Sequence, residues 1–117
     1  MENKKGYRRG EIWRVVLDPS VGIETQKTRP CLILQNDAGN KYSRGTTIVP
    51  LLSPRNTNFI VNIQPTKQNG LDKERGLHIH RIRSIDSSRI KNKLGKLEDS
   101  YWSDIHQAIN IHLGFLD

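Results

Sequence analysis

The apolar residues of this 117-residue chain fall mainly into short runs that are separated by turn-forming residues. Such runs at near-regular spacing are typical of strands and predict a small barrel or sandwich. A chain of this length buries one modest core, so we expect a single domain of mainly β class. The expected strands are Glu11–Leu17, Arg29–Gln35, Thr46–Leu52, Phe59–Gln64, Leu77–Ile82 and Lys93–Leu97, with loops at 18–28, Asn36–Gly45 and Pro65–Gly76.

The last part of the chain has a different pattern, with Tyr101, Ile105 and Ala108 at helical spacing. This spacing predicts a terminal helix over residues 98–113 that covers one end or face of the sheet, and Gly114 is expected to stop it. At the other end, residues 1–8 are polar and basic, and we interpret them as a flexible, frayed arm ahead of a domain at 9–117.

The charge is unevenly distributed along the chain. Lys and Arg number 19 against 12 Asp and Glu, a formal net charge of +7, yet residues 98–117 hold four acids and no Lys or Arg. The basic body therefore predicts a polyanionic partner, most simply nucleic acid, although solubility alone is the alternative explanation. No run is long enough to span a membrane, no secretory signal is apparent, and the one cysteine, Cys31, lies in an apolar run. We expect a structural cysteine and a cytoplasmic protein.

Arg29 lies where a long polar loop meets an apolar run. Pro30 follows it, and proline cannot donate a ladder hydrogen bond, so we expect it at the start or edge of a strand. The guanidinium is always charged and matches phosphate geometry, which makes Arg29 a candidate phosphate clamp. An ion pair with Glu24 that pins the loop explains the same residues equally well.

The polar residues on or beside the expected strands suit one reaction that needs no metal and no cofactor. In RNA, the 2′-OH can attack its own phosphate if a base accepts its proton and cations stabilise the developing charge. Arginine can stabilise charge, but its pKa is too high for it to act as an ordinary base. The base is therefore Glu24 or a histidine. His78 and His80 share a face of the expected strand and form a candidate acid–base pair, or else they only pack at the surface.

Five segments occur in an order and spacing that resemble the MazF/PemK (Kid)-type toxin family, whose patterns run R-G-D/E-I/V-Y/W, D-P-x-x-G-S-E, R-P-x-L/V-I/V, I/V-V-P and I/V-R/K-S/T-I/L-D. The matching segments are Arg9–Trp13, Asp18–Glu24, Thr28–Asn40, Ile48–Pro50 and Ile82–Asp86. The resemblance covers nearly the whole chain. It implies a small SH3-like barrel of the CcdB/PemK type that pairs into a homodimer. It also implies a sequence-selective, metal-independent endoribonuclease for single-stranded RNA, inhibited by a cognate acidic antitoxin.

The resemblance also assigns roles to residues. Arg29 matches the arginine that stabilises the transition state and takes part in proton transfer, and Glu24 matches the loop glutamate that assists it. Ser53 stands where the family usually has a threonine hydroxyl. His80 falls where some members carry an acidic catalytic residue, which suggests a histidine-assisted variant of the mechanism. The expected RNA-binding residues are Lys27, Thr28, Thr46, Thr47, His78, Arg81 and Arg83, and no metal ligands are expected.

Two other classes of protein remain open at this point. A gyrase poison of the CcdB kind shares the architecture, but the polar end Phe115–Asp117 lacks the Trp-Gly-Ile ending of those toxins. A non-catalytic nucleic-acid-binding barrel has the same basic surface, but it does not need Glu24, Arg29 and Ser53 to converge. Base choice is expected to depend on three loops, Val21–Thr28, Asn56–Asn58 and Pro65–Gly76.

Overall fold

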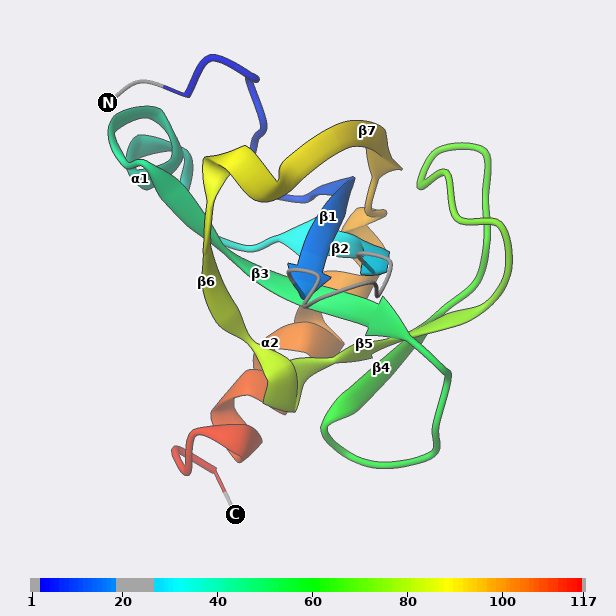
Figure 1. Cartoon of the computed structure of the whole chain (residues 1–117). Helices are drawn as coiled ribbons and strands as arrows, with labels where there is room; N and C mark the ends of the chain where they lie inside the picture. The colour runs from blue at the N-terminus through cyan, green and yellow to red at the C-terminus, as the bar shows by residue number, and fades with distance from the viewer. Residues whose placement is uncertain (1–2, 19–26, 117) are drawn as a thin grey trace.

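The computed structural model describes residues 3–18 and 27–116, and within them an antiparallel sheet is covered by a C-terminal helix (Figure 1). This confirms the expected mainly β class with a terminal helix. The strands are β1 Glu11–Asp18, β2 Lys27–Ile33, β3 Gly45–Leu52, β4 Ile60–Ile63, β5 Arg75–His78, β6 Arg83–Asp86 and β7 Ile90–Lys96. The helices are α1 Asp37–Tyr42, α2 Trp102–His112 and the 3₁₀ turns η1 Ile79–Arg81, η2 Ser87–Arg89 and η3 Asp99–Tyr101.

The strands follow the order β4-β5-β3-β2-β1-β7, and β6 pairs with β3 beside this path. Strand β3 changes partners along its length. Its middle residues pair with β2 up to Cys31↔Pro50, whereas Leu51 and Leu52 pair with β5. Pro50 has no N–H to extend a ladder. The ends of β2 and β3 therefore diverge beyond this pair, and that divergence makes room for the site described below.

Pro30 differs from expectation, because it is the fourth residue of β2 and β2 lies inside the sheet. It pairs with Arg14 of β1. Strand β2 begins at Lys27, two residues before the expected start at Arg29, and it ends at Ile33 rather than Gln35.

Two apolar clusters hold the fold together. One contains Ile12, Leu32 and Leu51 with Ile105 and Ala108 of α2, and the other contains Trp13, Cys31 and Ile48. Strand β1 contributes Ile12 to the first cluster and Trp13 and Val15 to the second, because successive side chains of a strand point to opposite faces. The expected burial of one helix face is confirmed, since Ile105 and Ala108 are 1% and 3% exposed.

Helix α2 ends as the sequence predicts. Gly114 has a φ of +82°, its N–H donates to the carbonyl of Ile111, and Phe115 N–H donates to the carbonyl of Asn110. These two bonds form a Schellman motif, which glycine accommodates without strain.

The loop between β4 and β5 packs on the outer edge of β7 and joins the two ends of the curled sheet (Figure 1). Lys96 N–H donates to the carbonyl of Gln68 at 2.9 Å. Gly70 and Gly95 allow this approach, because a Cβ on either would collide with the backbone opposite.

Three sequence expectations need correction. Residues Asp37–Tyr42 form the short helix α1, capped by the Asn36 side chain, where only turns were expected. The expected strand Leu77–Ile82 ends at His78, and a 3₁₀ turn leads to the additional strand β6. Residues 3–8 are not a frayed arm, because Tyr7 is 1% exposed and packs edge-on against Trp13.

In the described part of the chain, no helix is long and apolar enough to cross a membrane.

Candidate active site

Two adjoining pockets lie where β2 and β3 diverge, and Arg29, Leu52 and Arg81 line both. The first pocket also contains Leu17, Lys27, Pro50 and Arg83. The second, of about 760 Å³, extends to Ser53 and His78. Its volume falls within the ~300–1,000 Å³ typical of ligand sites.

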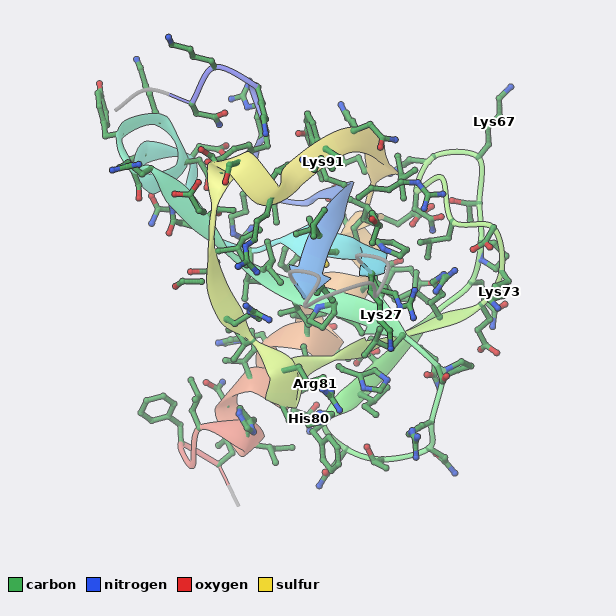
Figure 2. The ribbon with its side chains drawn as sticks, viewed as in Figure 1. Lys27, Lys67, Lys73, His80, Arg81 and Lys91 are labelled. Carbon is green, nitrogen blue, oxygen red and sulfur yellow. The ribbon has the colours of Figure 1, made fainter. Side chains whose placement is uncertain are left out.

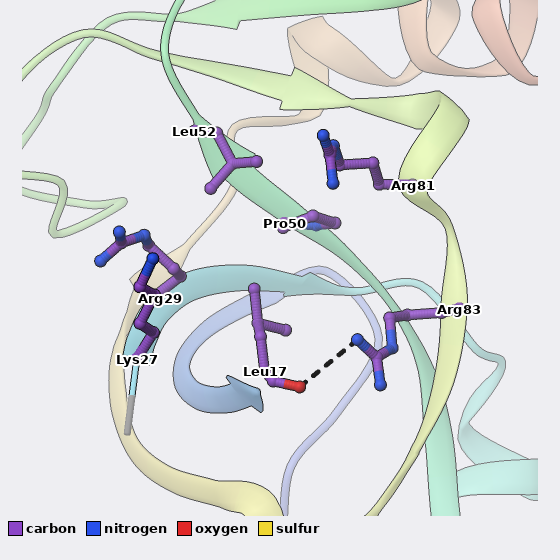
Figure 3. A pocket seen from close by; sticks show the side chains of 7 residues that line it. All are labelled: Leu17, Lys27, Arg29, Pro50, Leu52, Arg81 and Arg83. Atoms are coloured by element: carbon purple, nitrogen blue, oxygen red, sulfur yellow. Dashed lines mark hydrogen bonds between the residues drawn. The ribbon is translucent and has the colours of Figure 1, made fainter. Parts of the chain in front are cut away.

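Cations line two sides of the first pocket (Figure 3). Lys27 and Arg29 project from β2, whereas Arg81 and Arg83 lie on the opposite side, at η1 and β6. Between them lies an apolar floor of Leu17, Pro50 and Leu52. The Arg83 guanidinium donates to the Leu17 carbonyl at 3.4 Å, and Arg89 donates to the same oxygen at 2.9 Å. Positive charge around an apolar floor suits a nucleic acid, whose phosphates would lie near the cations and whose bases would lie near the apolar side chains.

Ser53 lies just beyond β3 and lines the second pocket together with Arg29. Its side chain is exposed, and the next residue is Pro54. The close approach of Gly76 fixes this corner, because a Cβ there would lie 2.7 Å from the Ser53 carbonyl oxygen. The predicted arginine and hydroxyl are therefore brought to one pocket.

His78 is buried at the end of β5 and is 5% exposed. Its Nε2 lies 2.8 Å from the carbonyl oxygen of Ser53. A carbonyl oxygen only accepts, so Nε2 carries the hydrogen and donates it. Within the described residues, Nδ1 is buried with no hydrogen-bond partner. The sequence predicted an RNA-binding His78, whereas these contacts fit a residue that positions Ser53.

His80 lies on η1 and is exposed. Its ring is 5.4 Å from that of His78 and meets Phe59 edge-on at 4.8 Å. The two histidines are therefore neighbours, although a 3₁₀ turn and not a strand brings them together. Partial desolvation of the ring, followed by electrostatic repulsion from its neighbours His78 and Arg81, lowers the pKa of His80. A histidine of lowered pKa is neutral at physiological pH and can accept a proton.

The remaining predicted residues lie in different places. Thr28 is half-buried in β2 beside Arg29. Thr47 pairs with Ser84 between β3 and β6, and neither Thr46 nor Thr47 lines the two pockets. Thr46 is 2% exposed, and its hydroxyl bonds to Asn40 Oδ1 at 2.6 Å, which supports α1. Glu24 lies outside the described residues.

Four charged residues that sequence reasoning did not single out also line the second pocket. They are Arg55, Lys73, Glu74 and Arg75. The last three fall in the expected loop Pro65–Gly76, which was linked to base choice without naming a residue, although Arg75 is the first residue of β5 in the structure. Figure 2 places Lys73 on this loop, to one side of Lys27 and Arg81.

Cys31 is fully buried, and burial raises the pKa of its thiol to about 12. The thiol therefore stays protonated, as expected for a structural cysteine. In residues 3–18 and 27–116, no three His, Cys, Asp or Glu side chains cluster as metal ligands.

Comparison with known proteins identifies the family. Residues 8–113 match the family described as PemK-like, MazF-like toxin of type II toxin–antitoxin system. The chain belongs to this toxin family. A relative named Endoribonuclease MazF, from Staphylococcus saprophyticus, is 36% identical over 110 residues, which are 92% of this chain and 91% of the relative.

Solved structures of MazF toxins share the fold. The Mycobacterium tuberculosis toxin MazF-mt6 superposes with a TM-score of 0.77 at 21% identity, covering 92% of this chain and 98% of that one. A mycobacterial endoribonuclease solved in complex with its cognate antitoxin gives a TM-score of 0.74, also at 21% identity, over 96% and 99% of the two chains. At such identity the likeness establishes the PemK-like, MazF-like fold alone.

Proposed function

We propose that this PemK-like, MazF-like chain is the toxin of a type II toxin–antitoxin pair and cleaves single-stranded RNA, including mRNA, in the cytoplasm. The observation that carries the proposal is that Arg29 and Ser53 line one pocket, together with Arg81. Membership of the family and the relative named Endoribonuclease MazF support the reaction class.

In the proposed reaction, the 2′-OH of one nucleotide attacks the adjacent phosphate and forms a 2′,3′-cyclic phosphate while the 5′-oxygen leaves. A base takes the 2′-OH proton, and an acid returns one to the leaving oxygen. Arg29 stabilises the charge on the phosphoryl oxygens with its guanidinium fork. Glu24 or His80 serves as the base, and the Ser53 hydroxyl bonds to the phosphate or the leaving oxygen. No cofactor takes part in this scheme, and it requires no metal ion.

The proposed assembly is a homodimer that a cognate acidic antitoxin inhibits. Three large apolar side chains are exposed at the end of α2, namely Leu113, Phe115 and Leu116 at 52%, 74% and 49%. Exposed apolar surface of this kind is typical of a protein interface. A second subunit would also extend the track available to an RNA of several nucleotides.

The test is end mapping on a long RNA incubated with the purified protein in EDTA. We expect cuts that leave a 5′-OH and a 2′,3′-cyclic phosphate or 3′-phosphate. A 2′-deoxy nucleotide placed 5′ of the scissile bond should abolish cutting, because the nucleophile is missing. Undiminished cutting of that substrate would contradict the mechanism. A gel shift without cleavage would favour a binding barrel, and inhibited supercoiling would favour a gyrase poison; no observation here favours either.

A further inference from the structure

Glu74 is an unexpected residue in the second pocket. The other charged side chains there are cationic: Arg29, Arg55, Lys73, Arg75 and Arg81. A carboxylate repels the phosphates of a ligand bound in this pocket. Glu74 is therefore expected to contact another part of the ligand.

The carboxylate of Glu74 makes no ion pair with those cations among the described residues. Its neighbour Arg75 instead pairs with Asp72 at 3.1 Å. The hydrogen bond that Glu74 does make comes from the side-chain amide of Gln64, with Nε2 donating to Oε2 at 2.7 Å. The presence of Glu74 in the pocket is therefore not explained by a role as counter-ion to these cations.

Gln64 is itself held on both sides of its backbone. Its N–H donates to the Tyr101 hydroxyl at 3.2 Å, and its carbonyl accepts from Asn69 Nδ2 at 2.9 Å. Asn69 is fully buried and also donates to Glu98 Oε1 at 3.0 Å. These bonds fasten Gln64 to η3 and to Asn69, so that its side-chain amide can orient the Glu74 carboxylate before any ligand arrives.

We propose that Glu74, oriented by Gln64, reads a guanine base of the RNA next to Arg29. The inference rests on the proposed function, since it assigns the base specificity of that same site. Single-stranded RNA presents its Watson–Crick edges to proteins. Guanine alone has two adjacent donors there, N1–H and the N2 amino group, which match the two oxygens of a carboxylate. Adenine, cytosine and uracil each place an acceptor beside their donor, and that acceptor faces the carboxylate unfavourably.

The test measures binding, so it does not depend on cleavage. The probe is a random 12-nucleotide RNA pool with 2′-fluoro sugars, which lack the attacking hydroxyl, and the bound fraction is sequenced. We expect guanine to be enriched about tenfold or more at one position with the wild-type protein. Glu74→Gln should remove most of this enrichment, because the amide offers one acceptor and one donor. Asp104→Asn, the same charge change on the exposed side of α2, should leave it intact.

A second probe replaces that guanosine with inosine, which lacks the N2 amino group. The replacement should weaken binding by the wild type about tenfold and binding by Glu74→Gln much less. Equal guanine enrichment by the wild type and Glu74→Gln, or no enrichment by either, overturns the proposal. If the wild type selects guanine through Glu74 but cuts no unmodified RNA, the proposed nuclease function fails and the base-reading role stands. Circular dichroism of Glu74→Gln checks that its fold is retained.

Discussion

The buried His78 donates a hydrogen bond from Nε2 to the backbone carbonyl of Ser53, at 2.8 Å. This bond ties the end of β5 to Ser53, which lines the second pocket together with Arg29. The histidine acts on the backbone rather than on the side chain of Ser53. It therefore fixes the position of the Ser53 backbone.

Replacing His78 should lower kcat while KM changes little, because substrate contacts remain and only the alignment of Ser53 is lost. A misplacement of about 1 Å can cost on the order of 100-fold in rate, and we expect a 10- to 100-fold loss for His78→Ala. His78→Gln should recover much of the rate, since its amide also carries a donor. The measurement is the initial rate of cleavage of a fluorogenic RNA at several RNA concentrations, which gives kcat and KM separately. His106→Ala, at an exposed position of α2, is the matched control. Equal losses for His78→Ala and His78→Gln would argue against the positioning role.

Arg29→Ala should reduce cleavage by roughly 100- to 1,000-fold, or about 2–4 kcal/mol, because it removes a charge-assisted contact made chiefly in the transition state. Arg29→Lys should rescue poorly, since a point charge does not reproduce the guanidinium fork. Thermal unfolding should be nearly unchanged, because this half-buried side chain makes only a long 3.4 Å bond to the Thr28 carbonyl in the described structure. Near-wild-type rates for Arg29→Ala would show that the active site lies elsewhere.

Ser53→Ala should also impair cleavage, whereas Ser53→Thr should retain it. The threonine keeps the hydroxyl and adds a methyl that restricts χ1. The exposed position has room for that methyl. Initial rates on one defined RNA, with saturation checked for each variant, compare the two changes. A silent Ser53→Ala would mean that Ser53 is not the hydroxyl the reaction uses.

The pKa of His80 lies below its ordinary value of 6.5, because burial and then the charges of His78, Arg81, His112 and Arg55 disfavour the imidazolium. A histidine that acts as a base must be neutral, and a lowered pKa keeps the imidazole neutral down to a lower pH. If His80 is the base, the acid-side fall in rate should come at a lower pH than an ordinary histidine would give. His80→Gln should lower the rate and abolish this acid limb of the pH profile. An unaltered rate and profile for His80→Gln, with Glu24→Gln inactive, would assign the base to Glu24.

Much of the fold follows from the sequence because local patterns determine it. Short apolar runs locate β1 and β3, alternation of apolar residues locates β4, and helical spacing with Gly114 locates α2 and its end. The short helix α1 was missed because Asp37, Gly39 and Asn40 favour turns locally. Tertiary contacts override that preference: Asn40 is buried, and its side chain bonds to Thr46. Strand β6 was missed because its residues are mostly exposed, and only pairing with β3 makes it a strand.

The candidate site likewise contains some residues that the sequence could identify and others that it could not. Arg29 and Ser53 carry sequence motifs, so they could be selected before their common pocket was known. Glu74 has no such motif, and its place depends on a loop fastened by Asn69, Gly70 and Gly95 through long-range contacts. The burial of His78, likewise, depends on β5 lying beside the end of β3. Pairing between distant segments is not visible in the spacing of residues.

Inhibition by the cognate acidic antitoxin should weaken as salt rises, because an acidic segment competes with RNA for the cations around Arg29. Arg81 lines both pockets and is exposed, so Arg81→Gln should weaken inhibition and reduce its salt dependence. Lys91→Gln removes the same charge from the exposed face of β7, outside both pockets, and should behave as wild type (Figure 2). The measurement is the inhibition constant from RNA cleavage at several salt concentrations. Inhibition that is insensitive to salt and to Arg81→Gln would place the antitoxin on another surface, such as the apolar end of α2 at Leu113 and Phe115.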